Sequence, residues 1–330
     1  MSGKNGSIQW SHHMSGDNGS PWGAAEGLTL DNGVIYTSSS VSGGYIYAFR
    51  ARDGAILWHT PVHPEGSPST PTLGNGVIYV SVTDASLASS HIYAFKAING
   101  TLLWRSPIQG CGSPPILVGS SLYLNAGICT GVGQQKGHVY ALNAGNGSIR
   151  WQYPLDNSPL WKPVVLNGIV YSDGGSTIYA IRGDTGALLW HKNGLSDDRS
   201  PLAGTGNVLS TQANGSLYGL RASDGKQLWQ AHIGNLGPYE PTIIGNTIYA
   251  ISSYDTAIYA LRLQDGATLW SYDSQDFPAG SFPLVDNGVV YFSMIHGTIF
   301  ELAASDGTPI VTYTLNDVHL WTHAPLAVGA

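Results

Sequence analysis

The segment Tyr47-Ala48-Phe49-Arg50-Ala51-Arg52-Asp53-Gly54-Ala55-Ile56-Leu57-Trp58 decides the fold, because the chain repeats it. Further copies stand at 93–104, 140–151, 179–190, 218–229 and 259–270. In all six copies a glycine precedes the tryptophan by four residues. A seventh and weaker copy, over 299–311, ends at Val311 where a tryptophan is expected. Repetition of this kind indicates a fold built from structural repeats.

A second element precedes each copy and begins with a proline that stands eight residues before a tyrosine. It covers 71–79, 115–123, 163–171, 241–249 and 283–291, and two looser versions end at Tyr36 and Ser210. Successive tryptophans of the first element are 46, 47, 39, 39 and 41 residues apart. This period suits a propeller blade of four short strands.

Each repeat divides into four strands separated by turns. In the second repeat we expect strands over 70–73, 77–82, 91–97 and 101–106. The turns Asn75-Gly76 and Asn99-Gly100 would supply the positive φ that hairpins need. A lone four-stranded sheet leaves both faces uncovered, whereas sheets packed around an axis cover one another. The sequence therefore predicts an all-β fold, a β-propeller of four-stranded blades.

The recurring tryptophan is interpreted as a docking residue between adjacent blades. Its ring would be buried there, and its N–H would donate to a carbonyl of the neighbouring blade. The small residue ten positions earlier, such as Ala48 before Trp58, would leave room for the ring. The residues with this predicted role are Trp10, Trp58, Trp104, Trp151, Trp190, Trp229 and Trp270.

Seven copies of the two central strands predict seven blades in a single domain over 1–330. The chain also opens on an orphan outer strand, over 5–12, and closes on an orphan inner strand, over 323–328. Two arrangements stay open, since these end strands either clasp a seven-bladed ring or belong to an incomplete eighth blade. We favour seven blades, because an eighth would lack its two central strands.

The composition excludes several classes of partner. The chain of 330 residues has 14 basic and 21 acidic side chains, a net charge of −7. This acidic balance argues against binding to nucleic acid. No run of 18 apolar residues is present, so we expect no membrane span.

The core pattern Ala-x-x-x-x-Asp/Asn/Thr-Gly-x-x-x-Trp resembles the tryptophan-docking motif of the pyrroloquinoline-quinone-type (quinoprotein-type) β-propeller repeat. That repeat builds bacterial quinoprotein dehydrogenases, the propeller lipoprotein of the outer-membrane assembly machinery, and sensor-like domains of bacterial kinases. The resemblance covers essentially the whole chain and implies a bacterial propeller. It departs at the third motif position, where the family usually has Asp and this chain has Arg50, Lys96, Asn143, Arg182, Arg221 and Arg262. We expect that position to make a surface turn contact.

The resemblance raises the question of a quinone cofactor with calcium. The family's dehydrogenases carry a disulfide between adjacent cysteines over the cofactor, whereas Cys111 and Cys129 are not adjacent. The family's Glu, Asn and Asp calcium ligands find no matching motif positions, and calcium needs about six to eight oxygen ligands. Common catalytic and metal-binding motifs are also missing. We expect no catalytic residue, no metal and no cofactor, with a quinone-dependent dehydrogenase as the alternative.

The sequence is equally consistent with a disulfide and with two free thiols at its two cysteines. Cys111 precedes the first strand of the third repeat, and Cys129 follows its second strand. Both loops would open on the same face of the propeller. A disulfide there would close a loop of ~19 residues, contribute about 3 kcal/mol, and imply an oxidising compartment. Two free thiols are the alternative.

The repeats differ most from one another just before the inner-strand proline. Two copies, 68–70 and 112–114, are small and polar, while the others carry large or charged groups. These positions would surround the mouth of the central channel, on loops where binding residues concentrate. The candidate ligand-binding residues are Trp161, Lys162, Arg199, Tyr239, Glu240, Trp321 and His323. They would make a polar and aromatic funnel for a sugar, a peptide or a small anion.

These observations favour a non-enzymatic recognition or scaffold propeller that binds a protein or a small polar ligand with its loop face. We expect a monomer. The out-of-register ends and the missing signal segment suit a sensor module of a larger bacterial protein. Few Lys and Glu among many Ser, Thr, Gly and Asn suit an extracytoplasmic setting.

Overall fold

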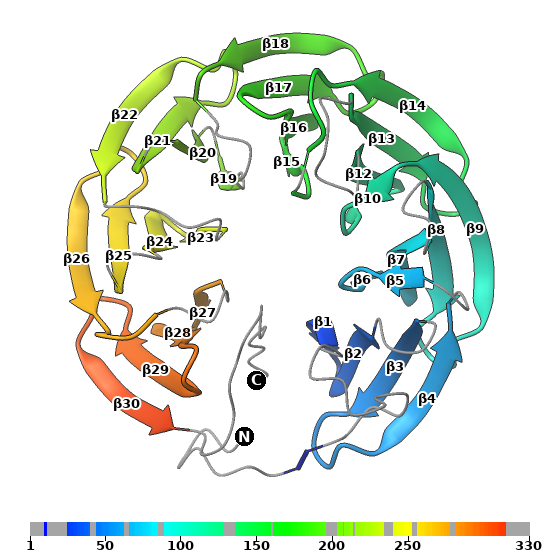
Figure 1. The fold of residues 1–330 in the computed structure, drawn as a ribbon, viewed down its shortest axis with the longest axis horizontal. Helices are drawn as coiled ribbons and strands as arrows, with labels where there is room; N and C mark the ends of the chain where they lie inside the picture. Colours follow the sequence, from blue (N-terminus) through cyan, green and yellow to red (C-terminus); the bar gives the residue numbers. More distant parts are fainter. Residues whose placement is uncertain are drawn as a thin grey trace.

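A computed structural model describes residues 10–11, 25–39, 44–62, 66–84, 89–127, 136–159, 161–195, 203–206, 208–213, 215–233, 240–252, 256–277 and 282–314. Strands and turns make up these segments, and no helix is present in them. The strands form seven antiparallel sheets that surround a central channel (Figure 1).

The first three blades hold the N-terminal half of the ring. The first blade consists of β1 (Ala25–Asp31), β2 (Val34–Ser39), β3 (Tyr45–Arg50) and β4 (Ile56–Pro61). The second consists of β5 (Gly66–Pro68), β6 (Thr72–Gly74), β7 (Val77–Asp84), β8 (Ser89–Lys96) and β9 (Leu102–Gln109). The third consists of β10 (Cys111–Gly112), β11 (Ile116–Val118), β12 (Ser121–Gly127), β13 (His138–Asn143) and β14 (Ile149–Pro154).

The remaining four blades follow in chain order. The fourth consists of β15 (Val164–Leu166), β16 (Ile169–Asp173), β17 (Thr177–Arg182) and β18 (Leu188–Asn193). The fifth consists of β19 (Ala203–Thr205), β20 (Val208–Ala213), β21 (Ser216–Arg221) and β22 (Gln227–His232). The sixth consists of β23 (Thr242–Ile244), β24 (Thr247–Ile251), β25 (Ala257–Arg262) and β26 (Thr268–Asp273), and the seventh of β27 (Leu284–Asp286), β28 (Val289–Ser293), β29 (Thr298–Ala303) and β30 (Pro309–Thr314).

Within each blade the strands lie in sequence order, with the first beside the channel and the last at the circumference (Figure 1). Seven four-stranded blades are therefore confirmed. In the second and third blades the inner strand is broken in two. At the break in the second blade, Ser69 N–H donates to Ser81 O at 2.7 Å, and Ser81 N–H donates to Ser69 Oγ at 3.1 Å. The serine side chain thus replaces a backbone acceptor just before Pro71, whose ring nitrogen has no N–H to donate.

The two hairpin turns predicted in the second blade differ from each other. At the inner turn Asn75 and Gly76 both have positive φ, 53° and 72°. At the outer turn only Gly100 does, with φ 68°, so the prediction was wrong for Asn99. The outer turn is longer, because Gly100 N–H reaches back to Lys96 O at 2.8 Å. Asn99 instead uses its Oδ1 to accept the N–H of Thr101 at 3.1 Å.

The hydrophobic core lies between blades rather than inside any one of them. Among the described residues the buried side chains form six clusters, each shared by two successive blades. Ile46 of the first blade, for example, packs in one cluster with Ile78 and Phe95 of the second. The sheets of the second to sixth blades bury both faces in this way, which explains their near-continuous apolar central strands.

The repeated tryptophans fasten successive blades at the circumference. Trp58 Nε1 donates to Ala97 O of the next blade at 2.9 Å, and its ring covers Gly100, where a Cβ would lie 2.6 Å from Cε3. Five other pairs repeat this contact with N···O distances of 2.8–3.1 Å: Trp104–Ala144, Trp151–Gly183, Trp190–Ala222, Trp229–Leu263 and Trp270–Ala304.

Trp10 makes the same contact on the first blade. Its Nε1 donates to Ala51 O at 2.8 Å, its ring covers Gly54, and it stacks on Phe49 with centroids 6.2 Å apart. The first blade thus receives from Trp10 what each later blade receives from its predecessor. Apart from residues 10 and 11, the predicted orphan strands over 5–12 and 323–328 lie outside the described residues.

Arginines at the third motif position form ion pairs in the outer turns. Arg50 Nη1 lies 2.9 Å from Asp53 Oδ2, and the same pair recurs as Arg221–Asp224 at 3.1 Å and Arg262–Asp265 at 2.9 Å. The predicted surface turn contact is present at these three turns.

Candidate functional site

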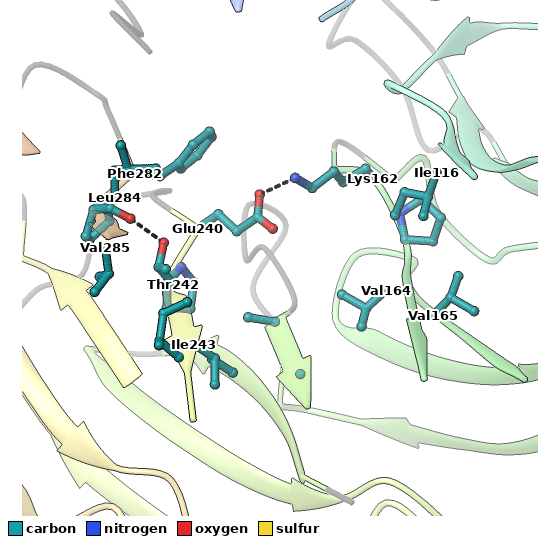
Figure 2. Close-up of a pocket in the computed structure, with 16 residues that line it drawn as sticks. Ile116, Lys162, Val164, Val165, Glu240, Thr242, Ile243, Phe282, Leu284 and Val285 are labelled. Atoms are coloured by element: carbon teal, nitrogen blue, oxygen red, sulfur yellow. Dashed lines mark hydrogen bonds and ion pairs between the residues drawn. The ribbon is translucent and has the colours of Figure 1, made fainter. Parts of the chain in front are cut away.

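The mouth of the channel is the end of the propeller at which the innermost strand of each blade begins. A cavity of about 470 Å³ lies there, along the inner strands of the third to seventh blades (Figure 2). This volume falls within the ~300–1,000 Å³ typical of small-molecule sites. Two of the predicted funnel residues, Lys162 and Glu240, are part of its lining.

Lys162 and Glu240 meet across the front of the fifth blade. Lys162 precedes β15 of the fourth blade and Glu240 precedes β23 of the sixth, and Lys162 Nζ lies 3.0 Å from Glu240 Oε2 (Figure 2). The side chain of Lys162 is 40% exposed and that of Glu240 is 19% exposed. A pair this accessible contributes only about 0.2–1 kcal/mol. The ion pair therefore joins the fourth and sixth blades only weakly.

Phe282 adds an aromatic surface to this pair. The residue precedes β27 of the seventh blade, and its ring centroid lies 6.0 Å from Lys162 Nζ. This is the outer limit of a cation–π contact. Phe282 is 38% exposed, so part of this residue is accessible to a ligand.

Threonine hydroxyls join the inner strands of some successive blades and not of others. In the first, second and sixth blades a threonine follows the position of the inner-strand proline and donates to a carbonyl of the next blade. Of these three threonines only Thr242 lines the cavity. Thr29 Oγ1 donates to Pro71 O at 2.6 Å, Thr72 Oγ1 to Pro115 O at 2.5 Å, and Thr242 Oγ1 to Pro283 O.

The corresponding positions in the third and fourth blades are Ile116 and Val164. Both side chains line the cavity, together with Ile243 and Val285. No hydroxyl ties the inner strands together at Ile116 and Val164, and the wall there is purely apolar. In the sequence this difference is marked by Pro-Thr at 71–72 and 241–242, a signal that was not among the predicted features.

A buried asparagine holds the segment that carries Lys162. Asn125, only 1% exposed, donates from Nδ2 to Trp161 O at 2.7 Å and accepts at Oδ1 from Ser172 Oγ at 2.9 Å. Its backbone N–H donates to Ser113 Oγ at 3.1 Å. Trp161 itself is half-buried and is not part of the cavity lining. Asn125 was not among the predicted site residues, and the corresponding position varies too widely between repeats, from Ser81 to Asp173 and Ile251, to single it out.

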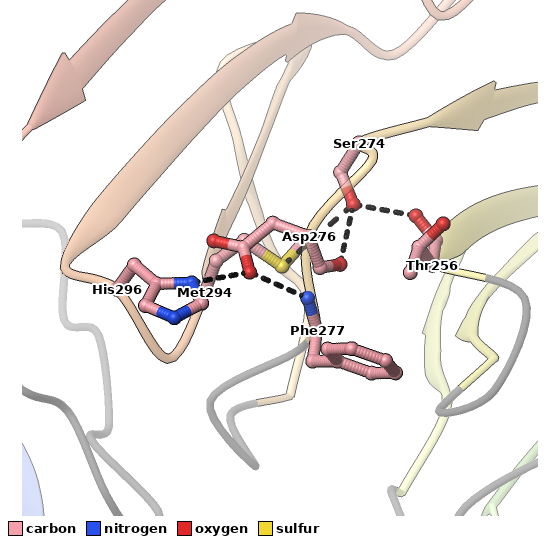
Figure 3. A network of polar contacts seen from close by, with 6 residues as sticks. All are labelled: Thr256, Ser274, Asp276, Phe277, Met294 and His296. Carbon is pink, nitrogen blue, oxygen red and sulfur yellow. Dashed lines mark hydrogen bonds and ion pairs between the residues drawn. The ribbon is translucent and has the colours of Figure 1, made fainter.

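A second polar network joins the sixth and seventh blades near the mouth (Figure 3). His296 Nδ1 lies 2.7 Å from Asp276 Oδ1, and the same oxygen accepts the N–H of Phe277 at 2.8 Å. Ser274 Oγ donates to Thr256 O at 2.5 Å. These contacts fix the start of the segment that leads from β26 toward Phe282.

The other predicted residues of the funnel are not placed. Arg199, Tyr239, Trp321 and His323 lie outside the described residues. Cys111 is disulfide-bonded, and Cys129, the other cysteine of the chain, also lies outside them. In the described part of the chain no group of three or more His, Cys, Asp or Glu residues stands where it could hold a metal ion.

Comparison with known proteins gives one family match and several structural neighbours. The family model described as outer membrane protein assembly factor BamB matches residues 1–159 and 88–313. No curated protein sequence matches the chain. A stretch of helix suited to crossing a bilayer is missing from the described segments.

Three solved structures share the fold at low sequence identity. A computationally designed protein, Ika8, has a TM-score of 0.77 at 14% identity, over 93% of this chain and 91% of its own. BamB from Moraxella catarrhalis has a TM-score of 0.60 at 17% identity, over 86% and 83%. A europium-containing methanol dehydrogenase has a TM-score of 0.66 at 13% identity, over 89% and 80%. A designed protein, an assembly factor and an enzyme thus share one architecture, and fold alone does not assign the function.

Proposed function

Because the chain belongs to the family described as outer membrane protein assembly factor BamB, we propose that it is a non-enzymatic propeller that recognises a protein or a small polar ligand at its channel mouth. The observation that carries this proposal is the ion pair between Lys162 and Glu240, which lies beside the accessible ring of Phe282 over a cavity. Charged and aromatic groups on a rigid ring are suited to binding.

The disulfide bond of Cys111 supports an extracytoplasmic setting. Disulfides persist in oxidising compartments such as the bacterial periplasm and are rare in the cytosol. The family's description as an outer membrane assembly factor points the same way. We propose that the protein works there as a monomer, alone or as a sensor module of a longer chain. Fractionation of the native host, with sedimentation analysis of the purified chain, tests both points.

A quinone-dependent dehydrogenase is the alternative that the dehydrogenase neighbours suggest. Pyrroloquinoline quinone carries several carboxylates, and in such enzymes calcium is held by carboxylate and amide oxygens. The described cavity lining offers one cation, Lys162, and Glu240 already neutralises it. The described residues therefore do not fit the quinone. Calorimetric titration with the quinone and calcium, beside a dye-reduction assay on alcohols and aldoses, should show neither binding nor turnover, and dye turnover would refute the proposal.

Site-specific photo-crosslinking tests recognition at the mouth directly. A photoreactive phenylalanine analogue at Phe282 should give one discrete adduct in cells of the native host, measured as an increase in the mass of the purified protein so that a small ligand and a protein partner are both detected. The matched control places the same analogue at Thr185, in the turn at the opposite end of the fourth blade, where Gly183 N–H bonds to Gly168 O. Equal adducts at both positions, or none at Phe282, would argue against a recognition site at the mouth.

A further inference from the structure

We propose that the cavity at the mouth binds a small zwitterion with an apolar side chain, a free aliphatic α-amino acid being the simplest case. The ligand would separate Lys162 from Glu240 and pair with both. This inference rests on the proposed function and adds the chemistry of what the mouth recognises.

The charge arrangement at the mouth favours a zwitterion over a simple ion. Among the described residues Lys162 and Glu240 have only each other as ion-pair partners. An anion entering between them would pair with the ammonium but face the carboxylate, and like charges at short range repel. A cation would meet the opposite problem. A ligand with one carboxylate and one ammonium replaces both halves of the pair and leaves no charge uncompensated.

The ease of opening the pair supports the exchange. The two side chains come from different blades and reach each other only at their ends (Figure 2). Both are long enough to move apart while their backbones stay in place. Phe282 offers Lys162 a π face at 6.0 Å, so the ammonium keeps a contact when the carboxylate turns to the ligand.

The aliphatic wall formed by Ile116 and Val164 determines the rest of the ligand. Both residues line the cavity on the Lys162 side of the ion pair (Figure 2), and they stand where other blades have the threonine hydroxyl. A methyl-bearing side chain would be removed from water against these groups, which is favourable in proportion to the area covered. A ligand of glycine's size would gain nothing from that wall.

Binding of L-leucine to the full chain, measured by ligand-detected NMR at millimolar concentration, tests the inference. The comparison ligands are N-acetyl-leucine, which keeps only the negative charge, leucinamide, which keeps only the positive charge, and glycine. We expect saturable binding of leucine and at least roughly ten-fold weaker binding of the two analogues, because each loses one charge-assisted contact. Glycine should also bind more weakly.

Two substitutions should each raise the affinity for one analogue, which structural damage would not do. In Glu240→Gln, N-acetyl-leucine no longer meets a negative charge, so its affinity should rise to that of leucine for the unsubstituted protein. In Lys162→Met, leucinamide should gain in the same way. Arg262→Met is the matched control, since it removes an exposed ion pair, with Asp265, that lies outside the cavity. Thermal melting of each variant shows that the fold is kept.

The outcomes separate this inference from the proposed function. Equal affinity for leucine and either analogue would overturn the zwitterion. Failure of leucine to bind, with a discrete adduct from Phe282, would also overturn it but leave recognition at the mouth in place. Failure of both would remove the inference and the function together.

Discussion

The docking of Trp10 predicts that Gly54→Ala destabilises the protein more than Gly33→Ala. The two glycines have nearly the same backbone conformation, with φ of 71° and 74°. An alanine at either position therefore costs about 1 kcal/mol for its unfavourable φ. Only Gly54 lies under a ring, since a Cβ there would be 2.5 Å from Cδ2 and Cε3 of Trp10, whereas nothing lies within 4 Å of a Cβ at Gly33.

The Trp10 ring can respond to a methyl group at Gly54 in two ways, and these two responses bound the additional loss of unfolding free energy. Forcing a methyl group into a packed contact typically costs about 1–3 kcal/mol. Moving the Trp10 ring away instead loses its hydrogen bond to Ala51, worth about 1 kcal/mol, and its stacking on Phe49, worth about 0.5–1.5 kcal/mol. Both routes give a similar figure. We expect Gly54→Ala to cost about 2–4 kcal/mol in total and Gly33→Ala about 1 kcal/mol.

Urea denaturation followed by far-ultraviolet circular dichroism measures both costs. The same two substitutions are then made in a Trp10→Ala background, where the indole ring no longer covers Gly54. There the two glycine substitutions should cost the same. Equal costs in the native background, or a difference that persists without Trp10, would refute docking of the tryptophan on the first blade.

Three further predictions concern buried groups. Ser38→Ala should cost about 1 kcal/mol of unfolding free energy, because Ser38 Oγ donates to Ser69 O at 2.8 Å. Ser210→Ala should be neutral or stabilising, because Ser210 Oγ is buried with no hydrogen-bond partner. A urea midpoint lowered as far by Ser210→Ala as by Ser38→Ala would contradict this. Burial, and then the hydrogen bond from its hydroxyl to Asp156, raises the pKa of Tyr179 from 10.0 to about 12. The unfolded chain therefore loses this proton at a lower pH than the folded protein, and the free energy of unfolding falls as the pH rises from 10 to 12. Tyr179→Phe should make this fall in unfolding free energy shallower, and an unchanged slope between pH 10 and pH 12 would speak against it. Thiol titration in denaturant should find no free thiol before reduction and two after it, because Cys111 is disulfide-bonded and the chain has two cysteines; a free thiol in the unreduced protein would disprove the bond.

The outer layer of the ring could be predicted from the sequence because its contacts recur. The spacing of glycine and tryptophan is a local pattern, and each Trp meets the same turn of the next blade, as Trp58 does at Gly100. Seven blades followed from counting copies. Strand ends were less accurate, since β7 and β9 of the second blade run to Asp84 and Gln109, beyond the predicted 82 and 106. Pairing there continues where no repeated residue marks a limit.

The inner layer could be predicted only in outline. Lys162 and Glu240 were expected at the mouth because both precede an inner-strand proline. Their pairing across the fifth blade depends on the width of the channel and the reach of two flexible side chains, and no local pattern encodes either quantity. Asn125 was missed for a related reason, since its role depends on a carbonyl 36 residues away in sequence.

The chemistry of the circumferential fastening has a consequence for how such a ring can be built. Each of the seven docking tryptophans donates to a main-chain carbonyl, a group that all residue types possess, so the acceptor position tolerates Ala97, Gly183 and Leu263 alike. The tryptophan contact therefore does not restrict which blade can follow which. Duplicating or deleting one of the first six blades would leave the tryptophan contact at each junction chemically unchanged. The number of blades is then limited by whether the ring of blades closes. Blades with different inner strands can be exchanged without changing the tryptophan contacts between them.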